Sequence, residues 1–178
     1  MNLFFRAFKC RNRNFIRRFF TTYIRPIVEN CTTVWSPHLL KDIQLLESVQ
    51  RKFTKRIPGL KNLPYGERLS ILNLDTLECR RLCNDLVMCY KMLHGHVNID
   101  YADFFNFCAD GLTRNRHNQR LVIEKSRLDC RKFGFSNRVV QPWNSLSQEA
   151  VDSRSIHVFK DHLRNFDFSR FLKYKCEF

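Results

Sequence analysis

The chain has 178 residues, of which 44% are hydrophobic. This length corresponds to one domain or two small ones, and it excludes activities that need several large modules. With only five Gly and five Pro beside 17 Phe, the composition also excludes a disordered or collagen-like chain. We therefore expect most of the chain to fold around a hydrophobic core.

The formal net charge is +14, from 31 Lys and Arg against 17 Asp and Glu. Residues 1–28 carry seven positive residues and no acid, and residues 111–148 carry eight positive residues against two acids. An excess of this size favours a polyanionic partner, either nucleic acid or an anionic membrane surface. Arg outnumbers Lys by 20 to 11, and the planar guanidinium suits bidentate pairing with phosphate. The excess lies in two segments on either side of a nearly neutral middle.

The sequence predicts no membrane-spanning helix. Its longest stretch without Lys, Arg, Asp or Glu, residues 30–40, has eleven residues, whereas a spanning helix needs about 20 apolar residues. Charged residues also interrupt the N-terminal apolar residues before the apolar core of a signal peptide forms. We expect an intracellular protein, in the nucleus or the cytoplasm, without a membrane partner and with its eight cysteines as reduced thiols.

The first predicted helix follows the basic N-terminus. Its apolar residues recur every four positions along one helical face. A proline inside a helix removes a backbone hydrogen bond and clashes with the preceding turn, so Pro26 predicts a kink or a break near Arg25. The residues that define the face are Phe15, Phe19, Tyr23 and Ile27.

Two further helices are predicted in the middle of the chain. Apolar residues at intervals of three or four predict a helix over residues 39–57, which ends at Pro58-Gly59. The run Asp75-Thr76-Leu77-Glu78 is close to a capping box and predicts the start of a long helix with Asp75 as its N-cap. Gly95 is expected to form the left-handed cap at the end of that helix.

Beyond residue 106 the helical periodicity fades. Residues 107–135 are expected to form a short irregular or β-containing insert, with short strands around residues 121–123 and 132–135. Helices are expected again over residues 136–146 and from about Ser155.

The predicted architecture is therefore mainly α, a helical bundle with this insert. A helical region covers residues 1–106, and a basic irregular segment with C-terminal helices covers residues 107–178. The sequence also allows the two regions to form one domain.

The run Tyr101-Ala102-Asp103-Phe104 is similar to the Tyr-x-Asp-Asp motif of polymerase palms, where adjacent carboxylates hold two divalent ions. Phe104 stands where the second acid is required, and no two acidic residues are adjacent anywhere in the chain. We therefore interpret the run as a short helix start capped by Asp100. Motifs of phosphate-binding loops, nucleophilic hydrolases and zinc proteases are absent as well, so no catalytic residue is assigned.

Zinc binding is the other chemical alternative. Cys79 and Cys83 have the spacing of one ligand pair, but on a straight helix His94 and His96 lie more than about 15 Å from Cys83. Reduced cysteines that fill core positions are the simpler interpretation. We therefore predict no metal site and no cofactor.

Two basic clusters are the candidate nucleic-acid-binding residues. The run from Thr113 to Arg120 combines arginines with amide side chains in a predicted loop, which suits contacts with phosphate and 2′-hydroxyl groups. The polar side of the 39–57 helix adds a second basic strip. Together with the net charge, the two clusters favour nucleic acid over a merely solvated surface. The candidate residues are Arg51, Lys52, Lys55, Arg56, Arg114, Arg116 and Arg120.

Several blocks occur in order along the chain: the run from Thr22 to Glu29 (TYIRPIVE), the run from Leu45 to Leu60 (LLESVQRKFTKRIPGL) and the run from Trp143 to Leu146 (WNSL). With further blocks between and after them, they span about residues 5–168. This order of blocks resembles the C-terminal region of reverse transcriptases from non-LTR retrotransposons, the Jockey-like LINE elements. Cys79, Cys83 and Ser147 depart from the family pattern.

The resemblance implies a thumb-like helical bundle, the thumb and post-thumb region that grips the template and primer duplex. The proteins of this family are RNA-directed DNA polymerases. Their catalytic aspartates precede the block that contains Arg25-Pro26-Ile27. The resemblance therefore implies a truncated fragment without polymerase activity of its own, which retains nonspecific binding to the backbone of RNA or DNA and a surface for docking to a missing palm domain. The alternative is a helical protein–protein interaction module without nucleic-acid function.

Overall fold

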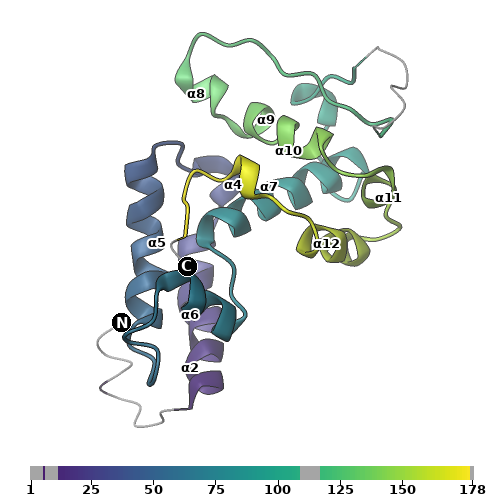
Figure 1. Ribbon diagram of the computed structural model, residues 1–178. Helices are drawn as coiled ribbons and strands as arrows, with labels where there is room; N and C mark the ends of the chain where they lie inside the picture. Colours follow the sequence, from purple (N-terminus) through teal and green to yellow (C-terminus); the bar gives the residue numbers. More distant parts are fainter. Residues whose placement is uncertain (1–5, 7–11, 109–116, 177–178) are drawn as a thin grey trace. The chain divides into compact units, whose positions relative to one another are not determined.

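The computed structural model describes residue 6, residues 12–108 and residues 117–176 (Figure 1). These residues form helices joined by turns, and the β pairing found among them is an isolated antiparallel bridge between Phe107 and Leu121. The mainly α class predicted from the sequence is confirmed. Within the described ranges, none of the helices has the length and apolar character that crossing a lipid bilayer requires.

The chain divides into two compact units, which we describe separately. Unit 1 consists of residues 1–31, 37–80 and 172–178, and unit 2 consists of residues 32–36 and 81–171. The division falls inside the helix α7 (Leu77–Leu93), whereas the sequence predicted a division between residues 106 and 107.

The helix that begins at Arg13 changes its hydrogen-bond pattern twice. It runs as α2 (Arg13–Phe19), the π-helical turn η1 (Phe20–Ile24) and α3 (Arg25–Glu29). The backbone N–H of Arg25 donates to the carbonyl oxygen of Phe20, five residues earlier. Because Pro26 follows with no N–H and a bulky ring, a widened turn accommodates it better than a regular one. The irregularity predicted near Arg25 is therefore a wider turn in a helix that continues.

The most deeply buried residues of this helix lie in the apolar row next to the one formed by Phe15, Phe19, Tyr23 and Ile27. Ile16 and Phe20 are buried, with 1% and 0% of their surface exposed, and they pack with Phe53. In contrast, Tyr23 is 63% exposed and Ile27 is 76% exposed. Two neighbouring apolar rows with the same spacing run along the helix, so spacing alone could not decide which of them is buried.

The helices α5 (Leu40–Thr54) and α6 (Tyr65–Leu72) complete the core of unit 1. The helix predicted over residues 39–57 is confirmed as α5, which ends three residues earlier in a turn that contains Gly59 at φ +80°. The sequence analysis did not predict α6. It has eight residues, follows a proline and ends at Asn73 in the left-handed conformation.

The start of α7 lies one residue later than predicted. The hydroxyl of Thr76 accepts a hydrogen bond from the backbone N–H of Cys79 at 3.1 Å, so Thr76 and not Asp75 is the N-cap. At the other end, Gly95 has φ +66° and the N–H of His96 donates to the Lys91 carbonyl oxygen at 2.8 Å. The predicted left-handed cap is confirmed.

Unit 2 contains most of α7 and several short helices. Val139, Val140, Trp143 and Phe159 have no exposed surface and lie in its core. The helix predicted over residues 136–146 forms as two short helices, and the one predicted from Ser155 is confirmed. The helices of unit 2 are α4 (Thr32–Trp35), α8 (Asp129–Lys132), α9 (Phe135–Arg138), α10 (Val140–Asn144), α11 (Gln148–Val151) and α12 (Ile156–Arg164), with 3-10 turns at η2 (Tyr101–Asp103) and η3 (Ser169–Phe171).

The strands expected in the insert do not form as predicted. Residues 132–135 belong to α8, α9 and the turn between them, so the strand predicted there is wrong. Around Leu121 the chain is extended and forms the isolated bridge with Phe107, in which the N–H of Val122 donates to the Asn106 carbonyl at 2.8 Å. The backbone groups of Leu121 itself are satisfied by a side chain: Asn144 accepts from the Leu121 N–H at 2.9 Å and donates to the Leu121 carbonyl at 2.8 Å. Because an amide pairs these groups, the bridge does not extend into a longer strand pair.

A buried ion pair joins α7, α9 and α4 inside unit 2. The guanidinium of Arg138 donates to both carboxylate oxygens of Asp85, at 2.8 and 3.0 Å, and to the carbonyl oxygen of Thr33 at 2.6 Å. Asp85 is only 2% exposed. Burial raises the pKa of Asp85, and the hydrogen bonds from Arg138 act against that shift. The pair therefore satisfies groups from three helices at one point of the core.

His117 ties the extended segment to α10. It is 2% exposed, and its Nε2 lies 3.0 Å from the Trp143 carbonyl oxygen, which only accepts hydrogen bonds. The proton of the neutral ring is therefore on Nε2. Burial lowers the pKa of His117 below its usual value of 6.5, although the hydrogen bond to Trp143 opposes this.

We expect the free energy of unfolding to fall as the pH is lowered from about 7.5 to about 5.5. The unfolded chain protonates His117 near its usual pKa, whereas the folded chain protonates it only at a lower pH, so the unfolded state binds more protons in this interval. Urea titrations at both pH values measure the effect. The fall should be smaller in His117→Gln and unchanged in the exposed control His157→Gln; equal falls in all three proteins would contradict the prediction.

Candidate nucleic-acid interface

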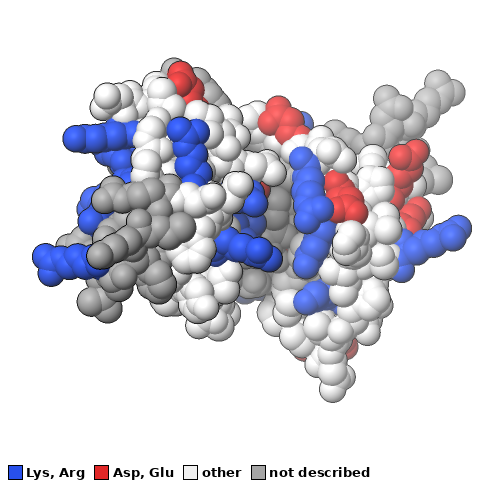
Figure 2. Space-filling model, turned by 90° about the horizontal axis from the view of Figure 1, so that it is seen from below, with Lys and Arg blue, Asp and Glu red and all other residues white. Residues whose placement is uncertain are grey.

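Four of the seven predicted residues lie together at the C-terminal end of α5 and in the turn that follows it. Arg51, Lys52, Lys55 and Arg56 are exposed, whereas Phe53 and Thr54 between them are buried. This alternation follows from the helical repeat, which turns consecutive pairs of residues to opposite sides. We call these four residues the α5 basic strip. Figure 2 shows one face of the molecule, on which Lys and Arg side chains protrude at several separate places, with uncharged surface and some Asp and Glu side chains between them.

Within the α5 basic strip, Arg51 is held by aromatic neighbours. Its guanidinium donates to the hydroxyl of Tyr174 and lies 5.2 Å from the ring centre of Tyr65 and 5.7 Å from that of Tyr174. A cation near an aromatic ring face is attracted by the ring quadrupole. Arg51 is therefore positioned by α6 and by the C-terminal residues, while the side chains of Lys52 and Lys55 are exposed to solvent.

Beneath the strip, Arg68 of α6 occupies the C-terminal end of α5. It is 4% exposed and donates to the Arg51 carbonyl oxygen at 2.9 Å and to the Thr54 hydroxyl at 3.0 Å. The carbonyl end of a helix carries a partial negative charge, which a cation at this position offsets. Arg68 therefore reduces the repulsion that a phosphate would otherwise meet at this end of α5.

The C-terminal segment, residues 172–176, is part of unit 1 and not a loose tail. The carboxylate of Glu78 accepts from the backbone N–H groups of Lys173 and Tyr174 at 3.1 and 2.8 Å. The ammonium of Lys173 donates to the His38 carbonyl oxygen at 2.6 Å. Glu78, expected from the sequence to cap α7, therefore fixes the segment that holds Arg51.

The second predicted cluster is only partly described. Arg114 and Arg116 lie outside the described residues. Arg120 belongs to unit 2 and is partly buried, its backbone carbonyl accepts from Cys108 at 2.9 Å, and its Nε has no hydrogen-bond partner in the described part of the chain. The residues of the first predicted cluster, the α5 basic strip, thus lie together in the structure. The second cluster, around Arg114 and Arg116, stays a prediction.

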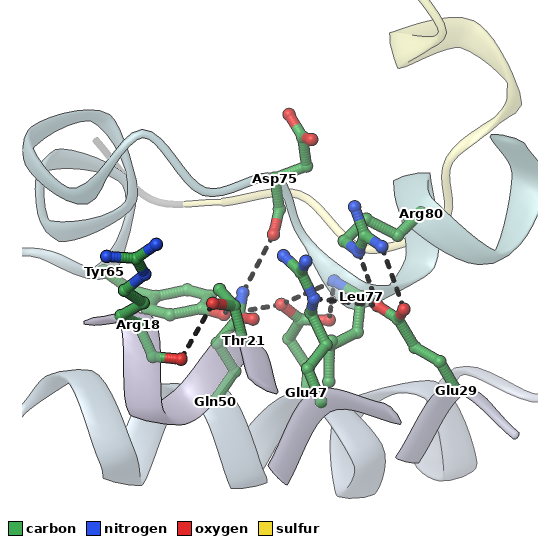
Figure 3. Close-up of polar contacts among 10 residues, drawn as sticks. Arg18, Thr21, Glu29, Glu47, Gln50, Tyr65, Asp75, Leu77 and Arg80 are labelled. Carbon is green, nitrogen blue, oxygen red and sulfur yellow. Dashed lines mark hydrogen bonds and ion pairs between the residues drawn. The ribbon is translucent and has the colours of Figure 1, made fainter. Parts of the chain in front are cut away.

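A buried polar cluster, which the sequence analysis missed, lies between α5, α6 and α7 (Figure 3). Glu47 is 1% exposed; it accepts from the Tyr65 hydroxyl at 2.5 Å and from the Leu77 N–H at 2.9 Å. Gln50 donates to the Tyr65 hydroxyl at 3.1 Å and to the Asp75 carbonyl at 2.9 Å. Burial, and next the Glu47 carboxylate, raise the pKa of Tyr65, so its hydroxyl stays a donor. The cluster fixes the start of α7 against α5.

A sequence signal for this cluster existed. Glu47 and Gln50 follow Ile43 at intervals of four and three, so they lie on the apolar face of α5. Figure 3 also shows Glu29 of α3 paired with Arg80 of α7, through Nε–Oε1 at 2.5 Å and Nη2–Oε2 at 2.9 Å. Arg80 therefore links helices within unit 1.

The polymerase and zinc alternatives gain no support. Asp100 accepts from the Ala102 N–H at 2.9 Å and caps η2, which confirms the structural interpretation of the run that begins at Tyr101. Across residues 12–108 and 117–176, no three His, Cys, Asp or Glu side chains are grouped so that they could hold a metal ion. None of the seven described cysteines forms a disulfide bond.

Comparisons with protein-family models, with curated proteins and with solved structures found no match to this chain. The candidate site is therefore defined by its own residues: the exposed α5 basic strip, the buried Arg68 that contacts it, and the buried polar cluster around Glu47.

Proposed function

We propose that this chain corresponds to the thumb and post-thumb region of a non-LTR retrotransposon reverse transcriptase, and that it binds the backbone of RNA or DNA inside the cell without sequence preference. The observation that carries the proposal is the α5 basic strip. It falls within the run from Leu45 to Leu60, the block most distinctive of the resemblance. Contacts between basic side chains and phosphates position a protein on a nucleic acid but do not read its bases.

The geometry of the strip suits a phosphate backbone. Arg51 and Lys55 are four positions apart, which on a helix corresponds to about 6 Å along the axis. Lys52 and Lys55 are mobile point charges, whereas Arg51 offers a planar guanidinium held in place by Tyr65 and Tyr174. The strip therefore combines one oriented contact with adaptable ones, as expected for binding that tolerates any sequence.

The second candidate function is a helical protein–protein interaction module, which includes docking to a palm domain. Its support is a set of exposed aliphatic side chains: Val34 is 84% exposed and Leu45 is 69% exposed. Single exposed apolar residues are ordinary on protein surfaces, whereas a net charge of +14 is not. The charge makes nucleic-acid binding the better-supported proposal.

Replacing both lysines of the strip, Lys52→Gln with Lys55→Gln, should weaken binding to an RNA–DNA hybrid duplex and flatten its salt dependence. Each lost phosphate contact lowers the slope of log K against log salt by about 0.9, so the double variant should lose up to about 1.8. Fluorescence anisotropy titrations at two or more salt concentrations measure the slope.

The matched control is Lys125→Gln with Lys160→Gln, which removes the same charge from exposed positions of unit 2. If both double variants weaken binding equally, the α5 basic strip is not the contact. If the unaltered protein binds neither duplex nor single strand at low salt, the proposed function itself is wrong.

A further inference from the structure

A shallow hollow lies on the solvent side of the helix that begins at Arg13, away from its buried face. Its volume is about 410 Å³, and it is lined by Phe15, Arg18, Phe19, Thr22 and Tyr23. We call it the aromatic hollow. Among the described residues, those that line the hollow come from α2 and from η1, which are successive parts of one helix.

Two aromatic rings of the hollow have a large exposed surface. Phe15 is 41% exposed and Tyr23 is 63% exposed, and the ring of Phe19, which is partly buried, lies 5.0 Å from that of Tyr23 at 34° to it. Ile16 and Phe20 are buried in the core of unit 1, and Phe19 packs against that core. The fold therefore leaves the rings of Phe15 and Tyr23 at the surface, where aromatic side chains are the ones that stack on planar partners.

The charge around the hollow points to an anionic partner. From Arg13 to Val28 the sequence has four arginines and no carboxylate. Arg13 and Arg17 donate to the carbonyl oxygens of Pro58 and Leu72, at 3.2 and 3.3 Å, and so stabilise the packing of unit 1. Arg18 is exposed and lines the hollow itself. A flat apolar surface beside a guanidinium fits a molecule with planar rings and phosphates.

We propose that the aromatic hollow binds unpaired bases of single-stranded RNA or DNA. The bases stack on Phe15 and Tyr23, and Arg18 contacts the adjoining phosphate. Such stacking tolerates any base and excludes a duplex, whose bases already stack on one another. This inference rests on the proposed function, and it adds a single-stranded contact to the duplex contact assigned to the α5 basic strip.

The test compares Tyr23→Ala with Ile27→Ala. Ile27 lies on the same helix and is 76% exposed, so its replacement removes apolar surface without removing an aromatic ring. The probes are a labelled RNA of about 16 nucleotides, the same RNA in a hybrid duplex and the same RNA with abasic positions. Tyr23→Ala should weaken binding to the single strand at least about fivefold, with little change for the duplex or the abasic strand. Ile27→Ala should match the unaltered protein throughout.

A second measurement does not depend on a variant. RNA that carries 4-thiouridine should form a photo-crosslink to a peptide that contains Tyr23. The inference fails if Tyr23→Ala binds the single strand as the unaltered protein does, or if both variants weaken binding alike. It also fails if Tyr23→Ala changes only self-association in sedimentation, because the hollow is then a protein contact. If the unaltered protein binds none of the three probes, the proposed function itself is wrong.

Discussion

Glu47→Ala should lower the free energy of unfolding by about 3 kcal/mol or more, because two buried donors, the Tyr65 hydroxyl and the Leu77 N–H, lose their acceptor. Each buried donor left without a partner costs about 1–3 kcal/mol. Glu47→Gln keeps one acceptor oxygen and should cost less. Denaturant titrations followed by circular dichroism measure the free energy of unfolding of the unaltered protein and of the two variants.

The matched control is Glu67→Ala on α6, which removes the same group from an exposed position. A surface change of this kind is expected to stay within about 0.5 kcal/mol. If Glu47→Ala and Glu67→Ala unfold at the same denaturant concentration, the polar cluster does not hold α5, α6 and α7 together as described.

Arg138→Met should be the most damaging single change in unit 2. It leaves Asp85, which is 2% exposed, without its counterion and leaves the Thr33 carbonyl without its donor. Removal of one partner from a buried ion pair costs about 3–5 kcal/mol. The free energy of unfolding should therefore fall by that amount, as measured in urea.

A double variant can show why Arg138→Met lowers the free energy of unfolding. Because the cost comes from an uncompensated buried charge, the double variant Asp85→Leu with Arg138→Met should be more stable than Arg138→Met alone. Arg164→Met, which breaks the exposed pair with Asp161, is the control and should have little effect. A double variant less stable than Arg138→Met would show that the contacts to α4, and not the charge of Asp85, dominate.

Local sequence patterns predicted most of the helices because their signals lie within a few residues. The N-cap Ser155, whose hydroxyl accepts from the Val158 N–H, and the apolar repeat of α5 are of this kind. The sequence did not determine which row of the helix that begins at Arg13 is buried, since two apolar rows compete there and the packing with Phe53 decides between them. The helix α6 is too short for its periodicity to stand out.

In the candidate site, too, one part could be predicted from local sequence patterns and another part could not. The exposure of Lys52 and Lys55 follows from the helical repeat alone. The contact that positions Arg51 does not follow from the helical repeat, because its partner Tyr174 lies 123 positions further along the chain. Contacts at such separation depend on how the chain folds back on itself, and a single sequence carries no local signal for them.

The C-terminal segment gives unit 1 a discontinuous chain order. Its helices α2, α5 and α6 are synthesised before residues 81–171, yet Tyr174, which packs with Ile43, Tyr65 and Leu69, is added after them. During translation these three side chains and Arg51 must wait for the whole of residues 81–171 to be made. A nonsense codon just after residue 171 would thus spare every described helix and still remove Tyr174 from the core of unit 1.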